Sequence, residues 1–160
     1  MLHIDVICIG KLKETFFKDA ILEYSKRLSK YCYLNIIELP DEKIPNNATI
    51  GQCEIIKQKE TKNIISHIKK ESYTFCLDLK GREYSSETFS EKIESISLNY
   101  NSHITFIIGG SLGLSPEIFN YANESICFSK MTFPHQLIRI FLLEQIYRAF
   151  KISNNETYHK

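Results

Sequence analysis

The stretch ITFIIGGSLGLSPE, residues 104–117, decides the fold class of this chain. Four of its first five residues are apolar, and all five are β-branched or aromatic, which is typical of a buried strand. A pair of glycines that begins at Gly109 follows at once and predicts a tight turn. Ser115, Pro116 and Glu117 then form a helix-start signal, because a capping hydroxyl precedes a proline and an acid. A strand, a glycine turn and a helix start make up the unit from which α/β proteins are built.

The same alternation continues along the whole chain, where strand-like apolar runs are separated by segments with apolar residues at helical spacing. The predicted strands are residues 2–9, 33–39, 73–79, 104–108 and 125–129. Apolar residues at helical spacing predict three helices, and their stripes are Phe17, Ile21, Tyr24 and Leu28; Cys53, Ile56, Ile64, Ile65 and Ile68; and Phe89, Ile93, Ile96 and Tyr100. We expect Ser86 to cap the third of these helices. This pattern predicts an α/β fold with a mainly parallel sheet and helices on both faces, and one long loop at residues 40–51.

Length and composition indicate an ordinary globular protein with one domain, residues 1–160. Hydrophobic residues make up 43% of the chain, charged residues make up 24%, and the net charge is +1. A protein that coats nucleic acid nonspecifically is strongly basic, so any contact with RNA must come from a local patch. The apolar run at residues 2–9 is too short to span a membrane and lacks a secretory pattern, so we expect a cytoplasmic protein with no membrane partner.

The five cysteines give no sign of a metal centre or a disulfide framework. Their number is odd, they are widely spaced, and no CxxC pair or Cys/His cluster occurs. We therefore expect buried free thiols and no metal.

Three predicted strand ends mark the place where a ligand is expected, because open parallel sheets bind ligands outside the carboxyl ends of their strands. These are residues 77–81, 108–113 and 128–133. The sequence GGSLG lacks the spacing of a dinucleotide loop or a P-loop, and a simple tight turn is the alternative. Met131 and Phe133 are large apolar residues in an expected turn, where they could form walls for a flat ring such as adenine, or only connect a strand to a helix capped by Thr132.

The final helix, expected to begin at Pro134, is apolar on nearly every side. It is either the core helix of a monomer or the interface of a dimer, because an all-round apolar helix must be covered all round. Glu144 and Arg148 have the spacing of an ordinary surface ion pair. His135 has the position of a helix cap, and His159 lies in a polar tail of the kind that is usually dispensable.

Five motifs together resemble the RlmH family over the whole length of the chain. They are IDVICIGKLKE (4–14), ELPDEK (38–43), FIIGGSLGL (106–114), FSKMTFPHQLIRIFLLEQIYRAFKI (128–152) and the terminal YHK (158–160). The resemblance implies a SPOUT-class methyltransferase that uses S-adenosylmethionine to methylate N3 of a pseudouridine in large-subunit (23S) ribosomal RNA, on assembled ribosomes. It also implies a C-terminal trefoil knot and an obligate homodimer. Ordinary rules of chain connection would not predict a knot.

The resemblance also implies roles for individual residues. The methyl-donor site falls on Leu77, on Gly109 and on the loop of Phe128, Ser129, Lys130, Met131, Thr132 and Phe133. His159 is implied as the base or the group that positions it, Tyr158 as the holder of the target ring, and Arg148, Arg139 and Lys160 as contacts to phosphate or developing charge. Asp78 and Leu114 lie where the family varies. A non-catalytic RNA- or ribosome-binding protein on the same scaffold, or a nucleotide-binding regulator, remains the alternative.

Overall fold

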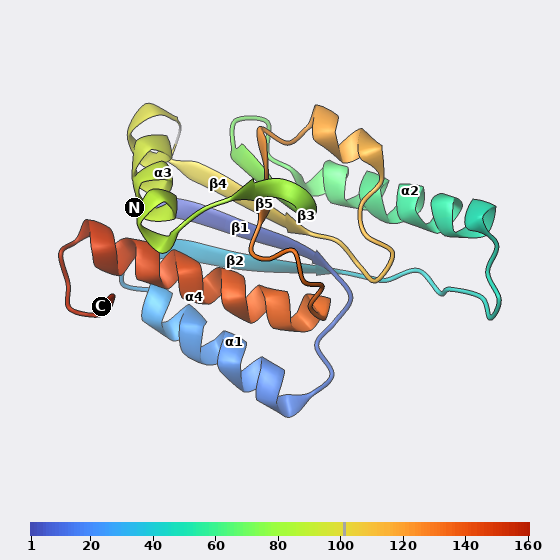
Figure 1. The fold of residues 1–160 in the computed structure, drawn as a ribbon, viewed down its shortest axis with the longest axis horizontal. Coiled ribbons are helices and arrows are strands. Elements are labelled where there is room, and N and C mark those ends of the chain that lie inside the picture. Colours follow the sequence, from blue (N-terminus) through green and yellow to red (C-terminus); the bar gives the residue numbers. More distant parts are fainter. Residues whose placement is uncertain (101) are drawn as a thin grey trace.

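Five parallel strands form a single sheet in the computed structural model, which describes residues 1–100 and 102–160. The strand order is β2-β1-β4-β3-β5, and every pair of neighbours is parallel (Figure 1). The predicted parallel α/β sheet is therefore confirmed. The strands are β1 Leu2–Ile9, β2 Cys32–Leu39, β3 Tyr73–Glu83, β4 His103–Ile108 and β5 Glu124–Cys127.

Each predicted helical stripe lies on a helix except for two of its members, Ile68 and Tyr100, which follow the last residues of the second and third helices as extended C-caps. The third helix is capped by Ser85 and not by Ser86, because Ser85 and Thr88 form a reciprocal capping box. Thr49 caps the second helix in the same way, so the long loop ends there. The signal at Ser115 starts only a short 3-10 helix. The elements are α1 Thr15–Leu28, α2 Ile50–His67, α3 Ser86–Asn99, η1 Pro116–Asn120 and α4 His135–Ser153.

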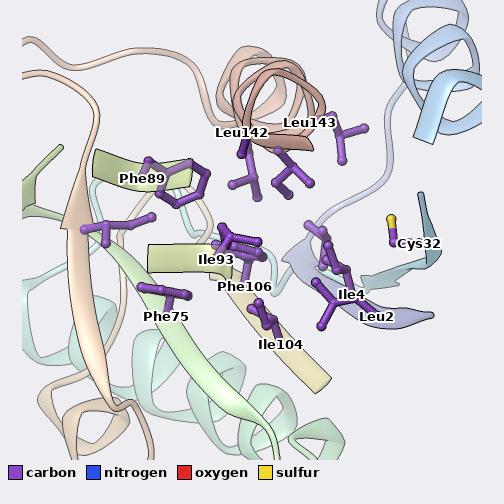
Figure 2. Packing of buried hydrophobic residues seen from close by; sticks show 14 of the residues in the cluster. Leu2, Ile4, Cys32, Phe75, Phe89, Ile93, Ile104, Phe106, Leu142 and Leu143 are labelled. Atoms are coloured by element: carbon purple, nitrogen blue, oxygen red, sulfur yellow. The ribbon is translucent and has the colours of Figure 1, made fainter. Parts of the chain in front are cut away.

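Two hydrophobic cores cover the two faces of the sheet, because successive strand side chains point to opposite faces. The larger core packs α1, α3 and α4 against one face, and the smaller core packs α2 and η1 against the other (Figure 1). Figure 2 shows Leu142 of α4, Phe89 and Ile93 of α3, and Phe106 of β4 gathered in the larger core. Each fully buried side chain of this size contributes roughly 1.5–3 kcal/mol, so this core fixes α4 on the sheet.

The contact between β3 and β5 departs from a regular ladder. Leu77 and Arg82 both align with Ile126, and the register shifts between them. A Cβ atom on Gly81 would lie 2.5 Å from the backbone carbon of Ile126, closer than real Cβ atoms approach other atoms. Only glycine therefore fits where these two chain segments meet.

Candidate active site

A cavity of about 700 Å³ lies outside the carboxyl ends of β4 and β5, next to the register shift of β3. We call it the loop cavity. Two loops and the segment Leu77–Leu79 form most of its wall, and the sequence predicts a ligand at all three. The predicted end of the third strand at residue 79 was wrong, because β3 continues to Glu83 and Leu77–Leu79 lie within it. Its lining residues comprise Leu77–Leu79, Ile108–Leu114, Ile126–Ser129, Met131–His135 and Ile138. Its volume is typical of sites for small molecules and cofactors, which run from about 300 to 1,000 Å³.

The structure brings most of the predicted donor-site residues together around this cavity. Lys130 is the exception, because it does not line the cavity although both of its neighbours do. Met131 is exposed to 74% of its maximum, and the Phe133 ring packs edge-on against Phe141 of α4 with centroids 5.4 Å apart. The predicted residues that line the cavity are Leu77, Gly109, Phe128, Ser129, Met131, Thr132 and Phe133.

The glycine loop has a conformation that depends on its glycines. Gly113 has φ +79°, a left-handed conformation that favours glycine, and its backbone N–H donates to the Gly110 carbonyl over 3.0 Å. A Cβ on Gly109 would lie 3.1 Å from the Gly113 carbonyl carbon, so it would press against the loop itself. The paired glycine at Gly109 thus allows the loop to fold tightly, and it does not simply leave space for a ligand.

Glu60 of α2 lies behind the glycine loop and was not predicted from the sequence. It is buried, its carboxylate accepts a hydrogen bond from the backbone N–H of Glu42, and a Cβ on Gly110 would lie 3.3 Å from its Oε1. Burial raises the pKa of Glu60, and the carboxylates of Asp41 and Glu42 raise it further. Glu60 belongs to a helical face that mixes polar and apolar residues, and such a pattern does not indicate in the sequence that this carboxylate is buried behind a loop.

A second cavity of about 490 Å³ adjoins the loop cavity, and we call it the side cavity. The two cavities share residues 126–129 and Phe133 as a common wall. The side cavity also reaches the start of α3, and Glu144 and Gln145 of α4 stand at its edge. The residues of this common wall therefore separate the loop cavity from Glu144 and Gln145 of α4.

The C-terminal tail folds back on α4 and forms a polar network that we call the tail cluster. Arg148 Nη2 donates to Glu144 Oε1 over 2.7 Å, and the Tyr158 hydroxyl donates to the same oxygen over 3.0 Å. The Arg148 guanidinium also stacks 4.7 Å from the centroid of the Tyr158 ring. Burial and the bond to Glu144 raise the pKa of Tyr158 to about 12. The tail cluster comprises Glu87, Glu144, Arg148, Tyr158 and His159.

Both ring nitrogens of His159 are engaged within this cluster. Arg148 Nη1 lies 3.2 Å from Nδ1, and Glu87 Oε1 lies 2.6 Å from Nε2. A guanidinium can only donate and a carboxylate can only accept, so Nδ1 accepts and Nε2 carries the proton. His159 therefore has no free ring nitrogen in this arrangement.

Arg139 lies apart from the other predicted catalytic residues. Its side chain is 2% exposed, and Nη1 donates to Glu38 over 2.9 Å. Nη2 donates to the carbonyls of Ile9 and Gly10, both over 2.8 Å. This guanidinium ties α4 to the carboxyl ends of β1 and β2, and it does not reach the tail cluster.

Three further features of the described residues bear on the class of site. No group of three or more His, Cys, Asp or Glu side chains within residues 1–100 and 102–160 is placed to hold a metal ion. None of the helices in the described part of the chain is long and apolar enough to cross a membrane. The five cysteines are free thiols, and four of them are buried.

Comparison with known protein families agrees with this architecture. The profile of the family described as "Predicted SPOUT methyltransferase" matches residues 2–159. The chain therefore belongs to the SPOUT methyltransferase family, and it is a methyltransferase. Family membership implies the C-terminal trefoil knot that the sequence resemblance predicts.

Individual relatives indicate which kind of methyltransferase this chain resembles. A protein from Clostridium botulinum (strain 657 / Type Ba4), named "Ribosomal RNA large subunit methyltransferase H", is 58% identical over 159 residues and covers 99% of this chain and 100% of its own. A Clostridium perfringens (strain SM101) protein named "Ribosomal RNA large subunit methyltransferase H 1" matches equally well. These relatives confirm the resemblance to the RlmH family. A solved structure of a probable methylase family protein from Haemophilus influenzae Rd KW20 shares the fold, with a TM-score of 0.56 at 12% identity over 98% of this chain and 70% of that one.

Proposed function

We propose that this protein transfers the methyl group of S-adenosylmethionine to N3 of a pseudouridine in large-subunit ribosomal RNA, on the assembled ribosome. The observation that carries the proposal is the loop cavity, which gathers seven of the donor-site residues that the sequence predicts. The names of relatives that match over the full length support ribosomal RNA as the substrate.

The residues around the loop cavity fit the proposed methyl donor. Leu77, Phe128 and Phe133 offer apolar surface to an adenine ring. The glycines of the loop, at positions 109, 110 and 113, present main chain without side chains. S-adenosylmethionine bound there supplies a methyl group on a positively charged sulfur. The protein then has to hold the target nitrogen in line with that methyl group, which lowers the entropic part of the barrier.

The tail cluster is the proposed grip on the substrate. Tyr158 holds the target ring, and Arg148 and Lys160 meet phosphate or developing charge. Arg148 and Tyr158 are fixed to the same carboxylate, Glu144, so the network presents them in a defined geometry. With both nitrogens engaged, His159 acts in this proposal as a positioning residue that connects Arg148 to Glu87.

A homodimer through the outer face of α4 completes the proposed site. Phe141 and Met131 expose apolar surface beside the loop cavity, at 36% and 74%. Interfaces of obligate dimers resemble a core cut in half, and this surface has that character. Pairing α4 with its twin would bring the tail of one protomer toward the loop cavity of the other.

The test is methylation of ribosomes purified from a strain that lacks this protein. The purified protein and S-adenosylmethionine are added to these ribosomes and, in parallel, to free large-subunit RNA. Mass spectrometry of RNA fragments should show one added methyl group on one pseudouridine, with assembled ribosomes as the better substrate. Ribosomes from the wild-type strain are the control, because their site is already modified.

Other outcomes would replace the proposal. Donor binding without methyl transfer to either substrate would favour a non-catalytic RNA- or ribosome-binding protein. Methylation at an atom other than N3 would still support a ribosomal RNA methyltransferase, but it would correct the atom that is modified.

A further inference from the structure

His135 is the first residue of α4 and lines the loop cavity. It is half-buried, and neither of its ring nitrogens has a hydrogen-bond partner among the described residues. This differs from His159, whose two nitrogens are both occupied. The loop cavity is therefore lined by a histidine whose ring nitrogens make no hydrogen bond within the described residues.

The surroundings of His135 come from three separate segments. A Cβ atom on Gly10, after β1, would lie 3.9 Å from His135 Nε2 and 4.0 Å from the Asp41 carboxyl carbon, so both side chains flank this glycine. The charged groups that act on the ring are Arg139 of α4, itself paired with Glu38, and Asp41 after β2. Burial, together with the Arg139 charge, lowers the pKa of His135, while Asp41 opposes the shift.

These observations suit a proton acceptor. An imino nitrogen such as N3 has to lose its proton before or during attack on a methyl group, and a positioned base contributes roughly 10²–10⁴-fold. A base must be unprotonated at working pH and must have a free lone pair. His135 has a lowered pKa and ring nitrogens without a hydrogen-bond partner among the described residues, whereas His159 would first have to release Arg148.

We propose that His135 is the residue that accepts the N3 proton of the target base. The inference rests on the proposed function and deepens it. The N3–H bond breaks and leaves its electron pair on nitrogen, the proton passes to a ring nitrogen of His135, and the N3–CH₃ bond forms. The bond between the methyl carbon and sulfur breaks, and its electron pair stays on sulfur. The imidazolium then lies near the Asp41 carboxylate, which stabilises it, and the proton leaves to water.

The first test needs no catalysis. Histidine-selective NMR of the whole protein follows the imidazole signals with pH, and the signal missing from His135→Gln identifies residue 135. We expect its midpoint below 6.5, the ordinary histidine value. Calorimetry with S-adenosylhomocysteine should give the same affinity for wild type, His135→Gln and His135→Asn, which also shows that the variants fold.

The second test is the single-turnover rate on assembled ribosomes at saturating S-adenosylmethionine. His135→Gln and His135→Asn should each lose about 10²-fold or more. The wild-type rate should fall as pH drops through the midpoint of His135, and the variants should lack this limb of the profile. His67→Gln, at the exposed end of α2, is the matched control and should keep the wild-type rate.

Three outcomes would overturn the inference. The first is variant rates close to wild type, the second is a His135 midpoint above 6.5, and the third is loss of S-adenosylhomocysteine binding in both variants, which would make His135 a binding residue. Failure of the wild-type protein to methylate ribosomes would instead contradict the proposed function, so the two failures are distinguishable.

Discussion

At the scale of single residues, backbone crowding fixes the strand that carries one wall of the loop cavity. Gly81 lies against the backbone of Ile126, at the point where β3 and β5 lose their regular register. Leu77, on the other side of this shift, lines the loop cavity. A glycine without a side chain therefore sets how closely two chain segments approach beside the site.

Gly81→Ala should destabilise the protein. The added methyl group would meet backbone atoms at 2.5 to 2.7 Å, and backbone cannot move aside as a side chain can. Overpacking of this kind costs typically about 1–3 kcal/mol. Urea unfolding at fixed protein concentration measures it.

The matched control for this substitution is Gly51→Ala in the first turn of α2. A Cβ there would contact only Thr49 Oγ1 at 3.9 Å, and alanine is the better helix former by up to about 1 kcal/mol. It should therefore be neutral or stabilising. Equal stability of the Gly81→Ala protein and wild type would contradict the close approach of β3 and β5.

The sequence could predict three of the segments that line the loop cavity but not the contacts behind them. Residues 77–81 and the paired glycines were predictable, because a ligand site at strand ends follows from a parallel sheet. The crowding at Gly81 and the position of Glu60 depend on chain segments far away in the sequence. The spacing of apolar residues along the chain does not indicate such long-range contacts.

At the scale of elements, α4 and the tail together form the polar part of the proposed site. Arg139 faces inward and binds the carboxyl end of β1, whereas Glu144 and Arg148 hold the tail. The sequence showed an apolar helix with polar interruptions, and spacing alone suggested only a surface ion pair for Glu144 and Arg148. A buried arginine that binds main-chain carbonyls 129 and 130 residues away could not be predicted from the helix itself.

Deletion of Tyr158, His159 and Lys160 should spare folding and donor binding, because these depend on the helices and the loops. It should still lower the single-turnover methylation rate by at least about 10²-fold, since the substrate grip and its positioning are lost. Asn154→Ala, at the end of α4 and outside the tail cluster, is the control and should keep its activity. A truncated protein with the wild-type rate would remove the tail from the active site.

At the scale of the whole molecule, alternation of strands and helices was enough to predict the parallel sheet and its two covered faces. The strand order β2-β1-β4-β3-β5 was not predictable, because it depends on which strands meet after long connections. The trefoil knot was predictable only through resemblance to a family, since general rules of chain connection exclude it.

The oligomeric state is a property of the whole molecule, and we predict a homodimer. Sedimentation at micromolar concentration should give about twice the chain mass of 18.7 kDa. Phe141→Glu should shift the protein toward the monomer, because it places a charge in the proposed apolar interface. Ile55→Glu, on exposed α2 across the sheet, should leave the dimer intact. A wild-type monomer under these conditions would contradict the proposed assembly.

Calorimetric titration of S-adenosylmethionine tests the central claim most directly, because the claim is that the loop cavity holds the methyl donor. Thr132 is exposed and lines the cavity, so Thr132→Trp should fill the space without disturbing the core. Thr15→Trp, at an exposed position on α1 that does not line the cavity, is the matched control. Saturable binding by wild type and Thr15→Trp, with loss of binding in folded Thr132→Trp, is the predicted result. Undiminished binding by Thr132→Trp, or no binding by the wild-type protein, would contradict the account.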